Sequence, residues 1–328
     1  MSRSKVVITD YVWDNLNIEH RELSDIADII SFKNATPEEF IGEASNCEAL
    51  LNTYAGPITR DLMEKMPNCL IISRYGIGVD TIDLDAATDL GIIVTNNPTY
   101  CVDEVADHAM ALLLAVNRKI TFYDHQVRDN GWSVAAGKPI LPLRGRTLGL
   151  VGFGKIARQV AARAAGFGLR VLYSDPHVSV SGQDVPAEKT TFEDLLERSD
   201  ILSLHTPLTA GTRGMIDEKA FKRMKPGALL INVARGPIVD TNALVKALDD
   251  GTIAGCGLDT TDPEPLPTAH PLRDRPNVVI TPHAAWYSEQ SMVRLQSGAP
   301  SEIRRLLNGI WPANVANNGV QGRTRAGI

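Results

Sequence analysis

Short apolar runs and stretches of helical periodicity alternate along this chain. Up to about residue 100, the apolar runs are rich in β-branched residues and predict strands. The predicted strands are "KVVITD" (5–10), "CEALLN" (47–52), "CLIISR" (69–74) and "GIIVTN" (91–96). Strands that alternate with helices are typical of a parallel α/β sheet, so the sequence predicts that fold class.

The middle of the chain has a different pattern. "VDEVADHAMALLLAVNRKI" (102–120) has a broad apolar face and no interior Gly or Pro, which predicts one long helix. The next stretch, "GWSVAAGKPILPLRGR" (131–146), is rich in Gly and Pro and holds Trp132, which we expect to be exposed. Such an excursion is typical of either a linker or an oligomerisation arm, and both interpretations stay open.

A second α/β series follows this excursion. Its predicted strands are "TLGLVG" (147–152), "LRVLYSD" (169–175), "ILSLHT" (201–206), "ALLINV" (228–233), "TIAGCGLD" (252–259) and "NVVITP" (277–282). A final helix is predicted over about 286–307. The last residues, "NNGVQGRTRAGI", are polar and rich in Gly, which predicts a frayed tail.

Composition narrows the class of protein. The chain has 328 residues, enough for two domains, and a net charge of −6, which argues against a general nucleic-acid binder. Its start shows no secretory leader, and no apolar run is long enough for a membrane span. The four cysteines, Cys47, Cys69, Cys101 and Cys256, form no CxxC pair, so we expect reduced core residues. These features predict a cytoplasmic enzyme.

Two predicted strands are followed by Gly-x-Gly, and only the second is expected to bind a dinucleotide. A dinucleotide site needs a tight turn into a helix and an acid at the end of the next strand. Gly152 and Gly154 meet this pattern, with Ala157 at the third fingerprint position and Asp175 at the next strand end. The carboxylate of Asp175 would repel a 2′-phosphate, and "PHVSV" after it brings no Arg, so NAD is favoured over NADP.

The first Gly-x-Gly, at Gly76 and Gly78, has neither a Gly or Ala at the third position nor an acid after the next strand. A turn that exposes successive backbone N–H groups forms a nest for anions. Arg74 precedes it, so we interpret the turn as a site for a substrate carboxylate. A plain strand-to-helix turn without a ligand is the alternative.

Hydride transfer also needs a proton donor and a cation, and these lie at carboxyl ends of strands in open α/β sheets. Three such ends carry suitable residues: Arg235, Glu264 and His283. Arg binds a carboxylate through two parallel hydrogen bonds, and His transfers protons near neutral pH when a carboxylate orients it. Helix capping, a solvated loop acid and a turn histidine are the respective alternatives. No two histidines have metal-ligand spacing, so no metal is expected.

The ordered motifs "SRYGIGVDTIDL", "GLVGFGKIA", "HTPLTAGTRGMIDEKAFKRMKPGALLINVARGPIVD", "GLDTTDPEPL" and "TPHAAW" resemble the D-isomer-specific 2-hydroxyacid dehydrogenase family over nearly the whole chain. "PHAAWYSEQ" is similar to its C-terminal-binding protein branch. The resemblance implies two Rossmann-like, doubly wound domains with an active-site cleft between them. Residues 1–103 with 294–328 would form a flavodoxin-like substrate domain, and 104–293 an NAD-binding domain with a hinge and dimerisation helix and arm.

The resemblance also implies roles for individual residues. Arg235, Glu264 and His283 would be catalytic, with His283 as acid/base assisted by Glu264 and with Arg235 orienting the substrate. The expected cofactor contacts are Gly152, Gly154, Lys155, Ile156, Asp175, Thr206, Pro207, Val233, Ala234 and Asp259, with Asp259 at the nicotinamide. The expected substrate contacts are Arg74, Tyr75, Gly76, Ile77, Gly78 and Trp286.

The predicted function is NAD-dependent interconversion of a small 2-keto acid and a D-2-hydroxy acid by a homodimer. 3-Phosphoglycerate dehydrogenase and glyoxylate or hydroxypyruvate reductase are alternatives within this class. An NADH-binding corepressor is the non-enzymatic alternative; no long extension follows the last predicted helix here, which favours the enzyme. The indole of Trp286 is expected to wall the substrate pocket and to favour an apolar or thioether side chain, whereas Tyr287 is expected to pack in the core.

Overall fold

The computed structural model describes residues 3–178 and 186–327. The chain forms two compact units. The terminal unit comprises Met1–Tyr100 and Ser288–Ile328, and the central unit comprises Cys101–Tyr287. The assignment of the terminal unit to the substrate and of the central unit to the cofactor stays a prediction.

The terminal unit is built on a five-stranded parallel sheet in the order β2-β1-β3-β4-β5. Its strands are β1 (Ser4–Ile8), β2 (Ala27–Ser31), β3 (Ala49–Asn52), β4 (Ile71–Arg74) and β5 (Ile93–Thr95). Its helices are α1 (Asn17–Leu23), α2 (Pro37–Ala44), α3 (Arg60–Glu64), α4 (Leu84–Asp89), α11 (Glu289–Leu307) and the 3-10 turn η3 (Asn318–Val320). Every residue of β3 and β4 is buried, as expected for central strands covered by helices on both faces.

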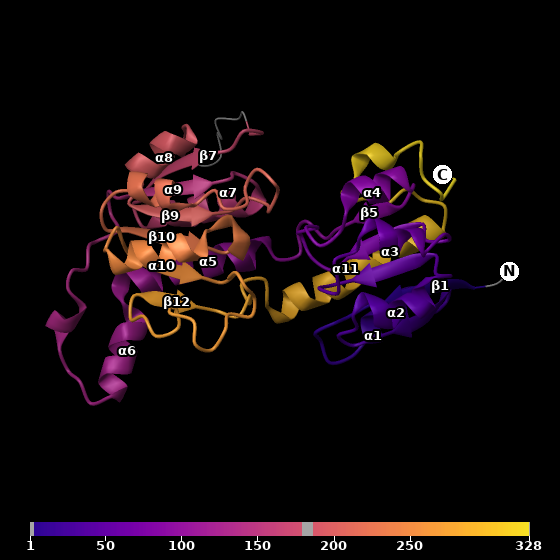
Figure 1. Ribbon diagram of the computed structural model, residues 1–328, viewed down its shortest axis with the longest axis horizontal. Coiled ribbons are helices and arrows are strands. Elements are labelled where there is room, and N and C mark those ends of the chain that lie inside the picture. Colours follow the sequence, from indigo (N-terminus) through magenta and orange to yellow (C-terminus); the bar gives the residue numbers. More distant parts are fainter. Residues whose placement is uncertain (1–2, 179–185, 328) are drawn as a thin grey trace. The chain divides into compact units, whose positions relative to one another are not determined.

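The central unit is built on a seven-stranded parallel sheet in the order β12-β11-β10-β9-β6-β7-β8 (Figure 1). Its strands are β6 (Thr147–Val151), β7 (Arg170–Ser174), β8 (Ala187–Lys189), β9 (Ile201–Leu204), β10 (Ala228–Asn232), β11 (Ile253–Leu258) and β12 (Val278–Ile280). Its helices are α5 (Val102–Arg118), α6 (Ile120–Arg128), α7 (Lys155–Gly166), α8 (Phe192–Arg198), α9 (Glu218–Arg223) and α10 (Thr241–Asp249), with 3-10 turns η1 (Val134–Gly137) and η2 (Gly236–Ile238). The predicted fold class, two doubly wound parallel α/β domains, is confirmed.

Helix α5 lies close against the sheet of the central unit, where it packs on α7, β10, β11 and β12. Its apolar stripe includes Val105, Leu112 and Val116, all buried. A Cβ atom on Gly257 of β11 would lie 2.9 Å from Cβ of Leu112, so only glycine lets the helix approach this closely. This contact fixes the face of α5 that packs against β11.

The prediction of one helix over 102–120 was wrong at its end. Helix α5 stops at Arg118, and Lys119 has a left-handed backbone with φ of 53° before α6 begins. Neither Gly nor Pro marks this break, which is why the apolar pattern did not reveal it. Trp132, in the following segment, is 89% exposed, as predicted.

The prediction of a frayed tail was also wrong. The Asn317 side chain accepts a hydrogen bond from the backbone N–H of Val94 and donates to the carbonyl of Ile92. Val320 is fully buried, and the backbone N–H of Arg325 donates to the carbonyl of Gly91. The polar composition of this segment reflects these long-range bonds to the β5 region.

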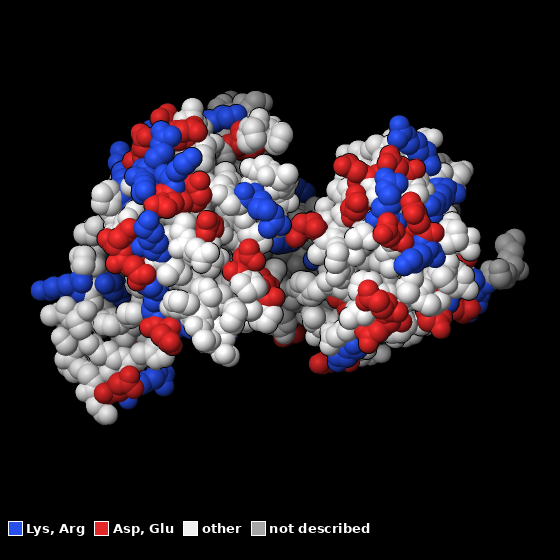
Figure 2. All heavy atoms as spheres, viewed as in Figure 1, with Lys and Arg blue, Asp and Glu red and all other residues white. Residues whose placement is uncertain are grey.

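Basic and acidic side chains are interleaved on the surface formed by α8, α9 and α10 (Figure 2). Arg223 pairs with Glu197 at 2.9 Å, and Lys246 pairs with Glu218 at 2.8 Å. Hydrogen bonds from Lys222 and Lys246 lower the pKa of Glu218 to about 2. Such exposed pairs contribute little to stability. Over the described ranges, no helix combines the length and apolar character needed to cross a membrane.

Candidate active site

The predicted site residues of the central unit gather at one edge of its sheet. All strands are parallel, so their carboxyl ends lie along that edge. The chain runs from β6 to β7 and β8 on one side, and then returns to β9 on the other side of β6. The strand order therefore reverses between β6 and β9, which is where open α/β sheets bind their ligands.

The loop from β6 into α7 has the shape that a pyrophosphate requires. Gly152 has φ of 88°, and a Cβ atom there would lie 2.6 Å from the carbonyl oxygen of His205 after β9. Around Gly154, by contrast, a Cβ atom would meet nothing among the described residues within 4 Å. No described side chain caps the start of α7, so its first N–H groups remain available for an anion.

Asp175 follows β7, the neighbour of β6. Its carboxylate binds the loop after β6 and the loop after β7 through hydrogen bonds. It accepts hydrogen bonds from the backbone N–H groups of Phe153 (2.8 Å), His177 (2.8 Å) and Val178 (3.1 Å). Partial burial raises the pKa of Asp175, but these bonds outweigh it, so its pKa lies below the ordinary value. The carboxylate is therefore ionised at neutral pH. Ser179 and Val180, from the stretch predicted to lack an Arg, lie outside the described residues.

The other predicted cofactor contacts lie at the same sheet edge. Lys155 and Ile156 begin α7, whereas Thr206 and Pro207 follow β9, and Val233 and Ala234 follow β10. The glycine turn, the open helix start and the ionised acid fit a dinucleotide. Among the described residues, no three His, Cys, Asp or Glu side chains are grouped so that they could hold a metal ion.

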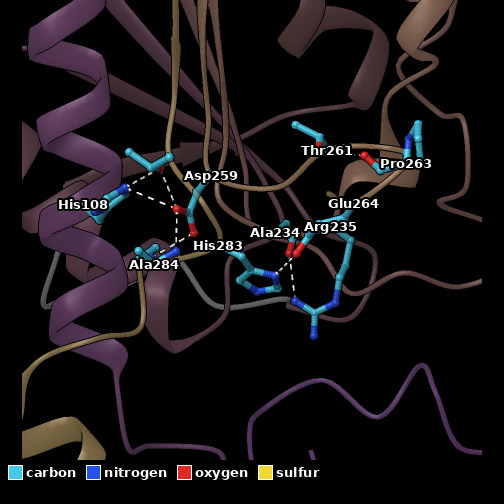
Figure 3. Close-up of polar contacts among 11 residues, drawn as sticks. His108, Ala234, Arg235, Asp259, Thr261, Pro263, Glu264, His283 and Ala284 are labelled. Atoms are coloured by element: carbon cyan, nitrogen blue, oxygen red, sulfur yellow. Dashed lines mark hydrogen bonds and ion pairs between the residues drawn. The ribbon is translucent and has the colours of Figure 1, made fainter. Parts of the chain in front are cut away.

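Arg235, Glu264 and His283 follow the neighbouring strands β10, β11 and β12, and the structure brings them together (Figure 3). Nδ1 of His283 lies 2.7 Å from Oε1 of Glu264. The His283 side chain is 23% exposed, so its ring is accessible but held by its partner. The Arg235 guanidinium donates to the carbonyl of Ala234 at 2.8 Å.

The electrostatic balance at Glu264 favours a carboxylate. Partial burial raises the pKa of Glu264, but the hydrogen bond and charge of His283, a backbone bond at Thr261 and the charge of Arg235 outweigh it. The pKa of Glu264 is therefore lowered from its ordinary value. An ionised Glu264 accepts the Nδ1–H of His283, which leaves Nε2 as the ring nitrogen for proton exchange with a ligand.

The backbone of His283 is left-handed, with φ of 54°, a conformation that costs free energy for a residue with a side chain. Asp259, 2% exposed, holds it there. The carbonyl of Asp259 accepts from the N–H of His283 at 2.8 Å, and its carboxylate accepts from the N–H groups of Ala284 and Ala285, each at 2.9 Å. The carboxylate of Asp259 is thus engaged by the 281–285 turn, which the sequence patterns did not indicate.

Two further residues that the patterns missed shape the Arg235 turn. Asn232, buried at the end of β10, donates to the carbonyl of Arg235 at 2.9 Å and accepts from the N–H of Ala234 at 3.0 Å. A Cβ atom on Gly236 would lie 1.9 Å from the carbonyl oxygen of Thr261. Only glycine therefore lets the loop that carries Glu264 pass this close to Arg235. In the sequence, the Asn and Gly that flank Arg235 in "NVARG" were the available signal.

The predicted substrate turn, Arg74–Gly78, belongs to the terminal unit and begins at the last residue of β4. Among the described residues, the N–H groups of Gly76, Ile77 and Gly78 donate no hydrogen bond within the protein. Gly76 has φ of 135°, and a Cβ atom there would lie 1.7 Å from the Arg74 guanidinium. The Tyr75 side chain is 1% exposed and its hydroxyl bonds Glu19, so only its backbone faces the turn.

Trp286 and Tyr287 end the central unit, three and four residues after His283. Their rings meet edge to face, with centroids 5.8 Å apart. Trp286 is partly buried. The expectation that Tyr287 packs in the core was wrong, because 51% of it is exposed.

The chain is similar over most of its length to known dehydrogenases and reductases. Residues 110–285 match the family described as D-isomer specific 2-hydroxyacid dehydrogenase, NAD binding domain. A glyoxylate reductase of Korarchaeum cryptofilum is 41% identical over 288 residues, which cover 85% of this chain and 86% of that protein. A D-lactate dehydrogenase from Aquifex aeolicus, complexed with NAD and lactic acid, matches with a TM-score of 0.86 and 28% identity, covering 98% of this chain and 99% of that one. An acyclic imino acid reductase in complex with NADPH and D-Arg matches with a TM-score of 0.87 and 30% identity, covering 95% and 99%.

Proposed function

This chain belongs to the D-isomer-specific 2-hydroxyacid dehydrogenase family, and we propose that Arg235, Glu264 and His283 carry its reaction. The reaction is the interconversion of a 2-keto acid and a D-2-hydroxy acid with a nicotinamide cofactor. The observation that carries the proposal is the 2.7 Å contact between His283 and Glu264. These residues follow β12 and β11, and Arg235 follows β10, the next strand of the sheet. A solvated loop acid and an unrelated turn histidine would have no reason to meet.

Each of the three residues has one task. His283 gives a proton to the carbonyl oxygen in reduction and removes it from the hydroxyl in oxidation. Glu264 accepts the hydrogen bond from Nδ1–H, which stabilises the protonated ring and leaves Nε2 for the substrate. Arg235 holds the substrate carboxylate and polarises the carbonyl, which a planar guanidinium does better than an ammonium. The nicotinamide, when bound, supplies or accepts the hydride.

The cofactor is held by the central unit in this proposal. The first N–H groups of α7, beginning at Lys155 and Ile156, would bind the pyrophosphate beside Gly152 and Gly154. Asp175 would accept hydrogen bonds from the adenosine ribose, and its negative charge favours NAD over NADP. Thr206, Pro207, Val233, Ala234 and Asp259 complete the expected contacts.

We infer that the substrate is a small 2-keto acid such as glyoxylate. In the turn Arg74–Gly78, the N–H groups of Gly76, Ile77 and Gly78 would bind the carboxylate, and Trp286 would wall the pocket for the group on C2, which is a hydrogen in glyoxylate. The glyoxylate reductase of Korarchaeum cryptofilum supports this substrate class. The narrower likeness to the C-terminal-binding protein branch rests on "PHAAWYSEQ" and stays a prediction.

We propose that the protein forms a homodimer through α6 and the segment that follows it, which extend away from the sheet of the central unit (Figure 1). No residue of α6 is buried. The apolar side chains exposed on this region are Ile120, Val127, Trp132, Val134 and Leu141. Sedimentation of the wild type and of a Trp132→Glu/Val134→Glu variant tests this: the dimer should become a monomer, and an unchanged mass would refute it.

The decisive experiment is NADH oxidation with a panel of 2-keto acids. The panel contains glyoxylate, hydroxypyruvate, 3-phosphohydroxypyruvate, pyruvate and a keto acid with a thioether side chain, each also measured with NADPH. We expect turnover of at least one small keto acid, which His283→Ala lowers roughly 10²- to 10⁴-fold while NADH affinity changes little. Tight NADH binding without turnover of any acid would instead favour the binding-protein alternative.

A further inference from the structure

We propose that His108, on helix α5, is a positioning residue that holds the catalytic turn of His283 in its left-handed conformation. His108 acts through Thr281 and Asp259 and touches neither His283 nor Glu264 in the contacts drawn in Figure 3. This inference rests on the proposed role of His283. It adds a group from a helix more than 150 residues earlier in the chain to a turn otherwise built from strand ends.

The contacts form a short chain of polar groups. Nε2 of His108 lies 2.9 Å from the hydroxyl of Thr281 and 3.4 Å from Oδ1 of Asp259. The Thr281 hydroxyl itself donates to Oδ1 of Asp259 at 2.6 Å. Because the only proton of that hydroxyl is used toward Asp259, Nε2 of His108 must be the donor in its contact with Thr281.

Asp259 is where this chain of contacts meets the catalytic turn. Its second carboxylate oxygen accepts from the N–H of Ala285, and Oδ1 accepts from that of Ala284 as well as from Thr281. Its carbonyl accepts from the N–H of His283. A buried carboxylate needs several donors, and His108 supplies positive polarity on the face of Asp259 turned to α5.

The placement of His108 on α5 suits this task. It stands in the helix stripe of Val105 and Leu112, and α5 is locked against β11 by the close contact of Leu112 with Gly257. The imidazole is 24% exposed on its side chain, so it is neither a surface residue nor a core residue filling space. A rigid helix therefore presents a hydrogen-bond donor to a strained turn. Support of this kind keeps a reacting group within a fraction of an ångström of its productive position.

The first test separates positioning from packing. We expect His108→Ala to lower kcat about tenfold while the Kd for NADH, read by its fluorescence, changes less than twofold. His108→Gln should restore most of the loss, because its amide nitrogen occupies the place of Nε2 and donates in the same direction. His20→Ala, an exposed histidine of α1, is the matched control and should behave as wild type. Wild-type kcat in His108→Ala, or no rescue by Gln in a folded variant, would overturn the inference.

A second test addresses the path. In a double-mutant cycle, His108→Ala is combined with Thr281→Val. The loss of kcat caused by His108→Ala should shrink to less than twofold in the Thr281→Val background, because both substitutions remove the same contact. Fully additive losses would contradict the proposed path through Thr281.

A third readout does not depend on turnover at all. Amide hydrogen exchange in peptides covering 281–287 should become at least tenfold faster in His108→Ala than in wild type, and Gln should slow it again. Unchanged exchange there refutes the inference even if no substrate is found. If exchange accelerates as expected in His108→Ala but His283→Ala leaves turnover unimpaired, the inference about His108 holds and the proposed function of His283 fails.

Discussion

Nδ1 of His283 and Oε1 of Glu264 lie 2.7 Å apart although they come from loops after two different strands, β12 and β11. The parallel pairing of these strands brings the loops together, and the left-handed backbone of His283 turns its ring to the carboxylate. Gly236 leaves the room for the Glu264 loop beside Arg235. The geometry of the pair is therefore a property of the sheet edge rather than of either loop alone.

Replacing the carboxylate tests that pair. Glu264→Gln keeps the size of the side chain but removes the charge that stabilises a protonated His283. We expect kcat to fall about 10- to 100-fold, with the Kd for NADH unchanged, because proton transfer is impaired and cofactor binding is not. Steady-state kinetics and NADH fluorescence measure the two quantities. Equal losses in kcat and NADH affinity would place Glu264 in the cofactor site instead.

Arg235→Lys asks whether the planar guanidinium is required. Lysine keeps the charge but cannot make two parallel bonds to a carboxylate. We expect kcat/KM for the keto acid to fall at least tenfold, with most of the change in KM, and NADH affinity to stay within twofold. Arg223→Lys, at a surface pair with Glu197, is the control. Normal substrate kinetics in Arg235→Lys would remove Arg235 from the substrate site.

The two glycines of the β6–α7 turn should fail in different ways. Gly152→Ala places a methyl group 2.6 Å from the carbonyl of His205 and strains a positive φ, so we expect a loss of stability on the order of 2 kcal/mol. Gly154→Ala has room in the protein, so its stability should stay within about 0.5 kcal/mol of wild type while NADH binds at least tenfold more weakly. Urea unfolding and NADH titration measure the two effects. Normal NADH affinity in Gly154→Ala would argue against a pyrophosphate at this turn.

Asp175 is expected to set the choice of cofactor. Asp175→Ser removes the charge that would repel a 2′-phosphate and keeps a hydroxyl that can accept one backbone bond. We expect the ratio of kcat/KM for NADPH to that for NADH to rise at least tenfold, because the repulsion is lost. The test compares both cofactors at one saturating concentration of keto acid. A ratio that stays at the wild-type value would show that another part of the site selects NAD.

Most of the strands, and the grouping of Arg235, Glu264 and His283 after neighbouring strands, could be predicted from the sequence because their signals are local. Central strands are buried on both faces and form apolar runs, and the three residues proposed to be catalytic lie in the loops that follow β10, β11 and β12. Strand β2, "ADIIS", and strand β8, "AEK", lie at sheet edges and carry polar residues, so no apolar run revealed them. No Gly or Pro stands at the break between α5 and α6, so the residue types around Lys119 do not reveal it.

Contacts between distant segments were beyond the reach of the patterns. No sequence pattern links His108 to its partners, Thr281 and Asp259, because they lie far along the chain. Likewise, the tail was expected to fray because the bonds of Asn317 to the β5 region cannot be read from composition. Periodicity places a residue on a face, but only the packed structure shows which polar groups that face meets.

His205 makes the stability of the protein depend on pH in a predictable direction. Burial lowers the pKa of His205 to about 4, whereas a histidine of the unfolded chain titrates near 6.5. Between these values the unfolded state binds a proton that the folded state excludes, so stability falls as the pH falls below 6.5. From pH 7 to pH 5 this one residue should lower the free energy of unfolding by about 2 kcal/mol.

The variant His205→Gln tests this dependence. It keeps a polar group within reach of Ser203, which lies 2.8 Å from Nε2, but it cannot take up the proton. Urea unfolding of the protein without cofactor at pH 7, 6 and 5 should therefore show a wild-type curve that falls more steeply than that of His205→Gln, with the exposed His20→Gln following the wild type. Parallel curves for wild type and His205→Gln would mean that His205 takes up its proton in the folded protein as readily as in the unfolded chain.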